Sequence, residues 1–477
     1  MVTTSSAATA ETAGGRVWAG DDFPDWLPPM LVRELRQGIQ SGAFFWTFVL
    51  LQLVLVLHAA FTVIATSGRF EGDLIRASGG FFWGILVITV GFVIPLRGLS
   101  AIATERVGNN LDLVRLTRLS ATRIVVGKWA AIVAQVLLVT AAILPYLVLR
   151  YFLGGVNVVA ELVRLGWLVV AAAVVAALAV YASTRPQRER VGLLALLAFG
   201  GWGGLMGAMV RGGGPAVAGG WFGCVVAALY ATLLLEAAAA SIAPASENHA
   251  FWKRLLGLGC AAVVAVAGFV CWRRDFAVVA PVFGLPVLVL AVGALCERPV
   301  RFRRMHAAFA RGGLLGRASA AMLTPGWATG LVFLTLAGGL VAVGCLAAAW
   351  PSNAWIAACV SLLAAAIVFP LPVLLFVPRL KERATLYVSV QAVCLVVFGI
   401  DTALITTPYG RGSWSALLAP FPLAGLLRLI GDGNSNSISM LGVAGLVVLA
   451  VILALVARPW LREMRHTERL VAGRPAP

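Results

Sequence analysis

Few residues of this 477-residue chain could do chemistry, and they are widely spaced. Two carboxylates, Glu236 and Asp401, lie inside long apolar segments. An ionised group is costly in hydrocarbon, so a carboxylate there is usually paired or functional, and the chemistry open to it is the binding of a proton or a cation. For both residues the alternative is a structural role, as the partner of an arginine or as a carboxylate that reaches the membrane interface.

Patterns typical of covalent or metal chemistry are missing from the sequence. The four His follow no HExxH spacing, and the seven Cys form no CxxC pair. Neither a GxSxG elbow nor a GxxxxGK[ST] phosphate loop occurs, and no loop carries an Asp/Glu/His cluster suited to a lipid-modifying enzyme. We therefore expect no catalytic, cofactor-binding or metal-binding residue. If this protein uses nucleotide energy, another chain must bind the nucleotide.

The segments that position the two carboxylates have the composition of membrane spans. Hydrophobic residues make up 61% of the chain and charged residues 12%, whereas about 25% charged is usual for a soluble globule. Twelve apolar runs of about 20 residues each predict an all-α, polytopic integral membrane protein with about 12 transmembrane helices. The runs are Phe45–Thr66, Gly79–Ala103, Trp129–Phe152, Leu162–Ser183, Val191–Val210, Gly219–Ala240, Leu255–Cys271, Val278–Leu295, Trp327–Ala349, Ala354–Val377, Leu386–Ile405 and Ile438–Val456.

The basic residues indicate the orientation of these spans. The net charge of +17 is spread over short clusters between apolar runs, which argues against a nucleic-acid partner and favours contact with anionic membrane lipid. Of the 37 Lys and Arg residues, 28 fall in segments on the same side as the N-terminus. This excess predicts that both termini are cytoplasmic. We expect a multi-pass protein of the cell membrane, typically the bacterial inner membrane.

Residues 1–27 are rich in Ala, Thr and Ser and predict a disordered cytoplasmic tail. The following segment, Pro28–Ser41, has an amphipathic pattern that includes Leu31, Glu34 and Leu35. We interpret it as a helix that lies along the inner membrane interface, with its prolines at the helix start. The alternative is an ordinary charged flank of the first span.

A polar loop, residues 105–128, separates the second and third runs. Its sequence predicts a short helix between two breaks, and Ser120 is suited to cap the helix of the third span. The short helix would have an apolar side able to fit a partner's groove, and a solvated basic connector is the alternative. The residues expected to dock a partner are Glu105, Arg106, Asn110, Leu111, Asp112, Leu113, Val114, Arg115 and Leu116.

The stretch Ala101–Gly155 resembles the permease subunit of ATP-binding-cassette exporters of the second permease class. The resemblance rests on the Glu105–Arg106 pair, on the Asn-Leu-Asp-Leu segment from Asn110, and on the Ile-Val-Val-Gly-Lys segment that ends at Lys128. Arg118 stands where the family usually has proline. The resemblance implies that residues 105–128 hold a coupling helix, that Pro28–Ser41 is an elbow helix, and that a separate ATPase subunit binds ATP and Mg²⁺.

Twelve predicted spans are twice the six that such permeases commonly have. We expect one six-span unit at residues 28–243 and a second at 244–477, whose cytoplasmic loop 297–326 begins at Glu297 and precedes Trp327. One explanation for the doubled number of spans is a tandem fusion of two permease units. The alternative is a single permease unit with an added six-span region, which would pair with a second permease chain. The expected function is ATP-driven export of an unidentified substrate. The other hypothesis is an ion-gradient-driven secondary transporter that uses Glu236 and Asp401.

Overall fold

The computed structural model describes residues 29–67, 72–103, 120–153, 157–196, 217–243, 249–270 and 313–327. It also describes short pieces at 293–294, 297, 309, 329–330, 332–334, 336–337, 340, 383, 385–390, 393 and 455. Every regular element in this part of the chain is a helix, and none of these residues is in a strand.

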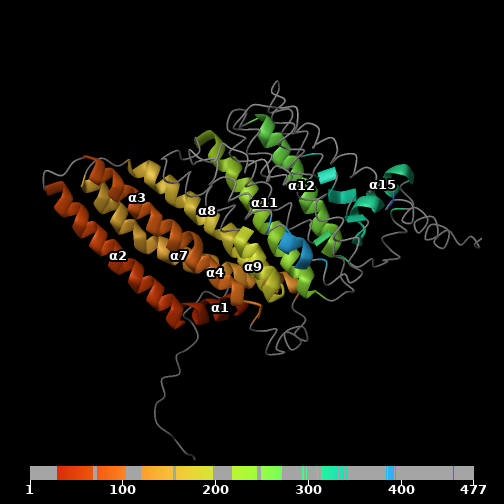
Figure 1. Cartoon of the computed structure of the whole chain (residues 1–477), viewed down its shortest axis with the longest axis horizontal. Coiled ribbons are helices and arrows are strands. Elements are labelled where there is room, and N and C mark those ends of the chain that lie inside the picture. The colour runs from red at the N-terminus through yellow and green to blue at the C-terminus, as the bar shows by residue number, and fades with distance from the viewer. Residues whose placement is uncertain are drawn as a thin grey trace, which may run out of the picture.

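The long helices lie side by side, from α2 at one edge of the bundle to α12 (Figure 1). Helix α2 packs against α3 and α7, α7 packs against α8, and α8 packs against α11, which in turn contacts α12. The bounds are α1 Pro29–Ile39, α2 Gly42–Ser67, α3 Gly72–Ile88, α4 Ile94–Leu96, α7 Ala121–Phe152, α8 Val158–Ser183, α9 Gln187–Leu196, α11 Val217–Ile242, α12 His249–Val270 and α15 Gly313–Leu323.

Five segments in the described part of the chain are long and apolar enough to cross a membrane. They are Gly42–Ile64, Ser78–Ser100, Ala121–Phe152, Val158–Ser183 and Cys224–Ile242. The shortest has 19 residues, which at 1.5 Å per residue reaches about 29 Å and matches the hydrocarbon thickness of a bilayer. The described part of the protein therefore has the helices of a membrane protein, and these five match five of the twelve predicted runs.

Local sequence explains where several helices begin. Ser120 precedes α7, and its hydroxyl accepts a hydrogen bond from the Arg123 amide at 3.4 Å, so the predicted cap is confirmed. Asn157 caps α8 by accepting from the amides of Val159 and Ala160 at 3.0 and 3.3 Å. Such caps satisfy amide groups that have no partner within the helix.

The second span is irregular, which the apolar run did not predict. After α3 the chain forms a π-helical turn, Thr89–Val93, then α4, and then a 3₁₀ turn, η2, at Arg97–Ser100. Pro95 lies at the start of α4, where its missing amide hydrogen interrupts the regular hydrogen-bond pattern. This change of helix type brings the side chain of Arg97 to the end of the bundle.

Small side chains allow the central helices to approach closely. A Cβ on Gly98 of η2 would lie 3.1 Å from both Ala179 of α8 and Ile132 of α7, so only glycine fits without displacement. Close backbone approach through small residues is a main source of helix association in membranes. The buried alanines of α8 and α11 are Ala172, Ala176, Ala177, Ala179, Ala182, Ala231, Ala237, Ala238 and Ala239.

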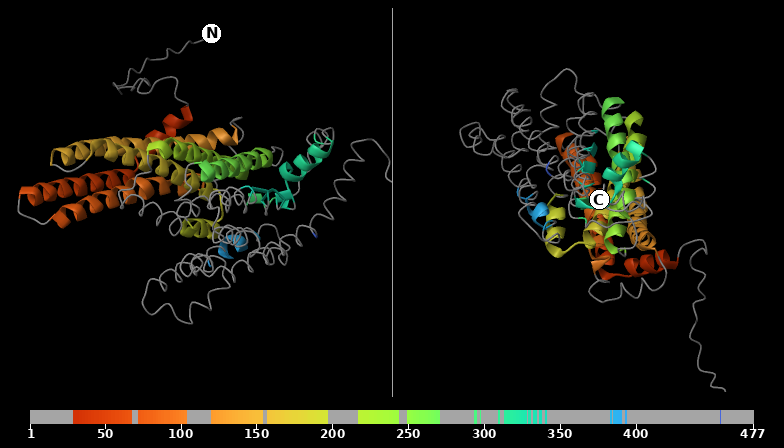
Figure 2. Two further views of the ribbon diagram at one scale, coloured as in Figure 1. Left: turned by 90° about the horizontal axis from the view of Figure 1, so that it is seen from above. Right: turned by 90° about the vertical axis from the view of Figure 1, so that its right-hand side faces the viewer.

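Helix α1 lies across the ends of the other helices rather than parallel to them (Figure 2). It begins at Pro29 and ends at Ile39, so a helix is present where Pro28–Ser41 predicted one, shorter by one residue at the start and two at the end. Ser41 follows it, and the Ser41 hydroxyl donates to the carbonyl of Gly38 at 2.7 Å. The chain then turns directly into α2, so the orientation of α1 is coupled to the first span.

Candidate functional site

Helix α1 is joined to the first turns of α7 by an ion pair between a half-buried glutamate and a buried lysine. The Nζ of Lys128 lies 3.0 Å from Oε1 of Glu34, and the Lys128 side chain is only 4% exposed. A buried charge without a counterion is strongly disfavoured, so Glu34 holds α1 against α7 at this point. We call the end of the bundle at which α1 lies the α1 end. It also holds the last turns of α8 and α11 and the first turn of α12.

Arg97 of η2 adds three further contacts to this junction. One guanidinium nitrogen donates to Oε1 of Gln135 on α7 at 2.9 Å, and the other donates to the Gly38 carbonyl at 3.3 Å and to the hydroxyl of Ser41. Cations are favoured at helix C-termini, where carbonyl groups lack partners, and Gly38 is in the last turn of α1. Arg97 therefore connects the second span, the third span and the end of α1.

The contact between α1 and α7 is close at Gly38. A Cβ on Gly38 would collide with the amide nitrogen of Gln135, which is buried and held by Arg97. We call the set Glu34, Gly38, Ser41, Arg97, Lys128 and Gln135 the junction cluster. It joins α1 to the second and third predicted spans, through η2 and α7.

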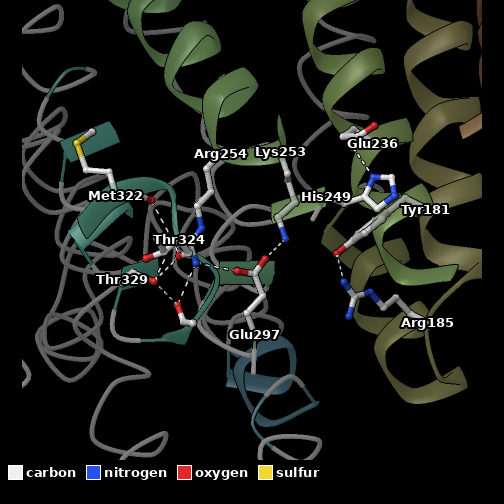
Figure 3. A network of polar contacts seen from close by, with 11 residues as sticks. Tyr181, Arg185, Glu236, His249, Lys253, Arg254, Glu297, Met322, Thr324 and Thr329 are labelled. Atoms are coloured by element: carbon white, nitrogen blue, oxygen red, sulfur yellow. Dashed lines mark hydrogen bonds and ion pairs between the residues drawn. The ribbon is translucent and has the colours of Figure 1, made fainter. Parts of the chain in front are cut away.

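A second buried polar cluster surrounds Arg254, at the start of α12 (Figure 3). The Arg254 side chain is fully buried, and it donates to Oε2 of Glu297 at 2.7 Å. Glu297 also pairs with Lys253. The remaining guanidinium contacts hold the turn that follows α15, through the carbonyls of Met322 (3.0 Å), Thr324 (2.5 Å) and Gly326 (2.9 Å) and the hydroxyl of Thr329 (3.0 Å).

The ionisation of Glu297 follows from these neighbours. Burial alone would raise the pKa of Glu297, but the charges and hydrogen bonds of Lys253 and Arg254 outweigh burial and lower it below its ordinary value. Glu297 is therefore a carboxylate at neutral pH. We call Lys253, Arg254, Glu297, Met322, Thr324, Gly326 and Thr329 the Arg254 cluster.

Glu236, one of the two predicted intramembrane carboxylates, pairs with a histidine. Its Oε1 lies 2.8 Å from Nδ1 of His249, the first residue of α12, and both side chains are about 15% exposed. The pair joins the last turns of α11 to α12, across the predicted boundary between the two six-span units. Figure 3 shows Tyr181 and Arg185 nearby, where the Arg185 guanidinium donates to the Tyr181 hydroxyl at 2.9 Å.

A third buried cluster lies at the end of the bundle opposite α1. Glu161 of α8 accepts hydrogen bonds from Trp83 at 2.9 Å, from Arg150 at 3.2 Å and from Arg164 at 3.1 Å. The guanidinium of Arg150 lies over the ring of Phe82 at 4.4 Å from its centroid, a cation–π contact. We call Trp83, Arg150, Glu161 and Arg164 the Glu161 cluster. It ties α3, α7 and α8 together.

All nine predicted docking residues lie outside the described residues, and so does the carboxylate Asp401. The nine are Glu105, Arg106, Asn110, Leu111, Asp112, Leu113, Val114, Arg115 and Leu116. Of the predicted elbow residues, Leu31, Glu34 and Leu35 are all in α1 and half-buried. The structure brings Glu34 to Lys128, the last residue of the predicted loop, and among the described residues it pairs Glu236 with His249.

Sequence reasoning missed the buried clusters formed by Arg97, Arg150 and Glu161. The available signal was the presence of charged residues within or at the ends of apolar runs, where they are usually paired and point into the bundle. Comparison with known proteins adds no assignment: no family model, no curated protein and no solved structure matches this chain.

Proposed function

We propose that this chain is the permease of an ATP-driven exporter in the cell membrane, the inner membrane in a bacterium. A separate ATP-binding-cassette ATPase would dock on the cytoplasmic loops and bind ATP and Mg²⁺. No residue of the permease would form or break a covalent bond. Closure of the ATPase pair would move the segment Asn110–Leu116, and that movement would change the packing of the first three spans.

The junction cluster is the observation that carries this proposal. A docked ATPase can drive transport only if its movement reaches the spans. Lys128 of α7 is bonded to Glu34 of α1, and Arg97 of the second span is bonded to Gln135 of α7 and to the end of α1. The two spans that flank the loop and the transverse helix are thus connected through a network of part-buried polar contacts, one of the kinds of physical network that carry coupling.

Replacing Leu113 or Leu116 by aspartate should reduce co-purification of the ATPase by about 100-fold or more. Each change would place a charge in an apolar contact, at a cost of several kcal/mol, and every 1.4 kcal/mol is about tenfold in affinity. Arg115→Ala is the matched control, because an exposed ion pair contributes about 0–1 kcal/mol. Pull-down of the tagged permease measures the effect. Retention of the ATPase by both aspartate variants at the wild-type level would reject the docking role.

Breaking the Glu34–Lys128 pair should uncouple ATP hydrolysis from transport. Glu34→Lys leaves two cations in contact, so we expect at least a tenfold loss of transport with the ATPase still bound and still hydrolysing ATP. The charge-swapped double variant Glu34→Lys/Lys128→Glu should recover a substantial part of the loss, because it restores the attraction. Transport and ATPase rates measured in the same proteoliposomes separate the two steps. Equal loss of both rates in Glu34→Lys would argue for a merely structural pair.

The Glu236–His249 contact favours one second candidate, an ion-gradient-driven transporter. A carboxylate and an imidazole 2.8 Å apart can share and release a proton, which is the chemistry such a transporter needs. Transport that persists without an ATPase, stops with an uncoupler and disappears in Glu236→Gln or Asp401→Asn would support this candidate over the ATP-driven one.

A further inference from the structure

Helix α2 carries two buried nitrogen atoms that have no hydrogen-bond partner among the described residues, Nε2 of Gln52 and Nε2 of His58. His58 is 6% exposed, and its ring lies 5.6 Å from the Phe82 ring and 6.0 Å from the Phe81 ring. Polar groups inside a membrane bundle are nearly always paired, because hydrocarbon offers them no partner. Two unmatched groups on one helix therefore call for a functional explanation.

Both atoms lie where α2 packs against its neighbours, and polar residues of α7 lie alongside. Oε1 of Gln52 accepts a hydrogen bond from the Tyr146 hydroxyl of α7 at 2.8 Å, which fixes the amide and leaves its NH₂ group unmatched. One turn further along α7, Arg150 lies over Phe82, whose other neighbour is His58. We call Gln52, His58, Tyr146 and Arg150 the α2–α7 seam.

The seam is rich in hydrogen-bond donors. The NH₂ group of Gln52 and the Arg150 guanidinium donate only, and the histidine ring can donate as well. Arg150 shares its counterion, Glu161, with Arg164, and a guanidinium group has five N–H donors, so Arg150 can bind a second acceptor. An acceptor-rich anionic group such as a phosphate complements this arrangement.

The opposite face of α2 indicates how such a group would arrive. Only 17% of the α2 span is buried, and its outward face carries large apolar side chains suited to lipid tails. A ligand with a phosphate headgroup and acyl chains could keep its chains on this face while the headgroup enters between α2 and α7. The exposed apolar residues of α2 are Phe45, Trp46, Val49, Leu50, Leu53, Val56, Leu57, Phe61, Val63 and Ile64.

We propose that the α2–α7 seam binds the phosphate headgroup of an anionic phospholipid that enters sideways from the bilayer. The headgroup would supply an acceptor to the unmatched nitrogens of Gln52 and His58. The idea that the bound lipid is also the transported substrate rests on the proposed function. The binding site itself is a property of the permease alone.

Lipid affinity and stability, measured on the purified permease without an ATPase, test the site. The probes are phosphatidylglycerol and phosphatidylcholine in nanodiscs, and glycerol 1-phosphate in solution. Wild-type permease should bind phosphatidylglycerol at least tenfold more tightly than phosphatidylcholine and should not bind glycerol 1-phosphate at comparable concentration. His58→Leu should lose about tenfold in phosphatidylglycerol affinity while its thermal midpoint stays equal to or above that of the wild type, because an unmatched polar group has been removed.

Gln52→Leu combined with Tyr146→Phe provides a second variant with the same two expectations, since it removes both partners of one hydrogen bond. Thr140→Val, which lies on α7 outside the seam, is the control and should leave the lipid preference unchanged.

Equal binding of the two phospholipids by the wild type would overturn the proposal. So would loss of stability with unchanged lipid affinity in both seam variants, which would mark these residues as structural. Binding of glycerol 1-phosphate as tight as that of the phospholipid would assign the site to a free phosphate ester instead. ATPase co-purification, measured separately, tests the proposed function independently.

Discussion

Replacing Glu297 by alanine is expected to lower the free energy of unfolding by about 3–5 kcal/mol, the usual cost of removing one partner of a buried ion pair. The substitution leaves the fully buried Arg254 and its neighbour Lys253 without their shared carboxylate. Denaturant titration of the purified protein in detergent measures the effect. Ser389→Ala is the control, because its exposed hydroxyl contacts only a backbone carbonyl in its own helix. A change below about 1 kcal/mol in Glu297→Ala would contradict the role assigned to the Arg254 cluster.

Acid should reproduce the effect of this substitution in the wild type. The pKa of Glu297 in the folded protein is below its ordinary value of 4.5, so the ionised carboxylate stabilises the folded state at pH values above 4.5. That contribution is lost as the pH falls through the lowered pKa, because the unfolded chain then binds the proton more tightly. The difference in stability between the wild type and Glu297→Ala should therefore shrink below pH 4.5. A difference that stays constant into strong acid would show that the charge of Glu297 is not what matters.

Glu161→Gln should cost a similar amount, about 3–5 kcal/mol, because Glu161 is the shared acceptor of Arg150, Arg164 and Trp83. Glutamine keeps the size of the side chain but removes the charge, so two guanidinium groups lose their common counterion. Arg164→Met is the matched comparison. It should cost clearly less, since Arg164 is the more exposed of the two arginines and Glu161 keeps Arg150.

Thermal denaturation of the three proteins side by side measures this ranking. If Arg164→Met proved as damaging as Glu161→Gln, the stabilisation would reside in a single ion pair rather than in the three-helix cluster. The comparison also bears on the α2–α7 seam, because Arg150 belongs to both. A Glu161→Gln variant that remained folded would be expected to bind anionic lipid more tightly, since Arg150 would then have lost its internal counterion.

The spans were predictable because their signal is local. Runs of apolar residues about 20 long identified the cores of α2, α7, α8 and α11, and the capping pattern at Ser120 predicted that α7 begins before its apolar run, as it does at Ala121. The hydropathy of a segment indicates its length and position, but it does not distinguish an α-helix from a π- or 3₁₀-helix. For that reason the change to π and 3₁₀ geometry around Pro95 in the second span was not anticipated.

The polar clusters were less predictable because they depend on contacts between distant parts of the chain. Glu34 and Lys128 are 94 residues apart in the sequence, and Arg254 and Thr329, which also contact each other, are 75 residues apart. Their sequence signal was limited to charged residues near the ends of apolar runs, which suggests pairing but names no partner. Glu236 shows this limit directly. The carboxylate was identified as paired or functional, and its partner in the structure is His249 rather than an arginine.

The position of Arg254 also bears on how the protein is made. During synthesis the start of α12 leaves the ribosome before Glu297 and before the turn that ends at Thr329, which follows 75 residues later. At 5–20 residues per second, that interval lasts about 4–15 s. Arg254 has no carboxylate partner until Glu297, 43 residues later, has been translated, and its contacts are complete only once Thr329 has followed. The Arg254 cluster therefore assembles late, only after a further stretch of chain has been translated.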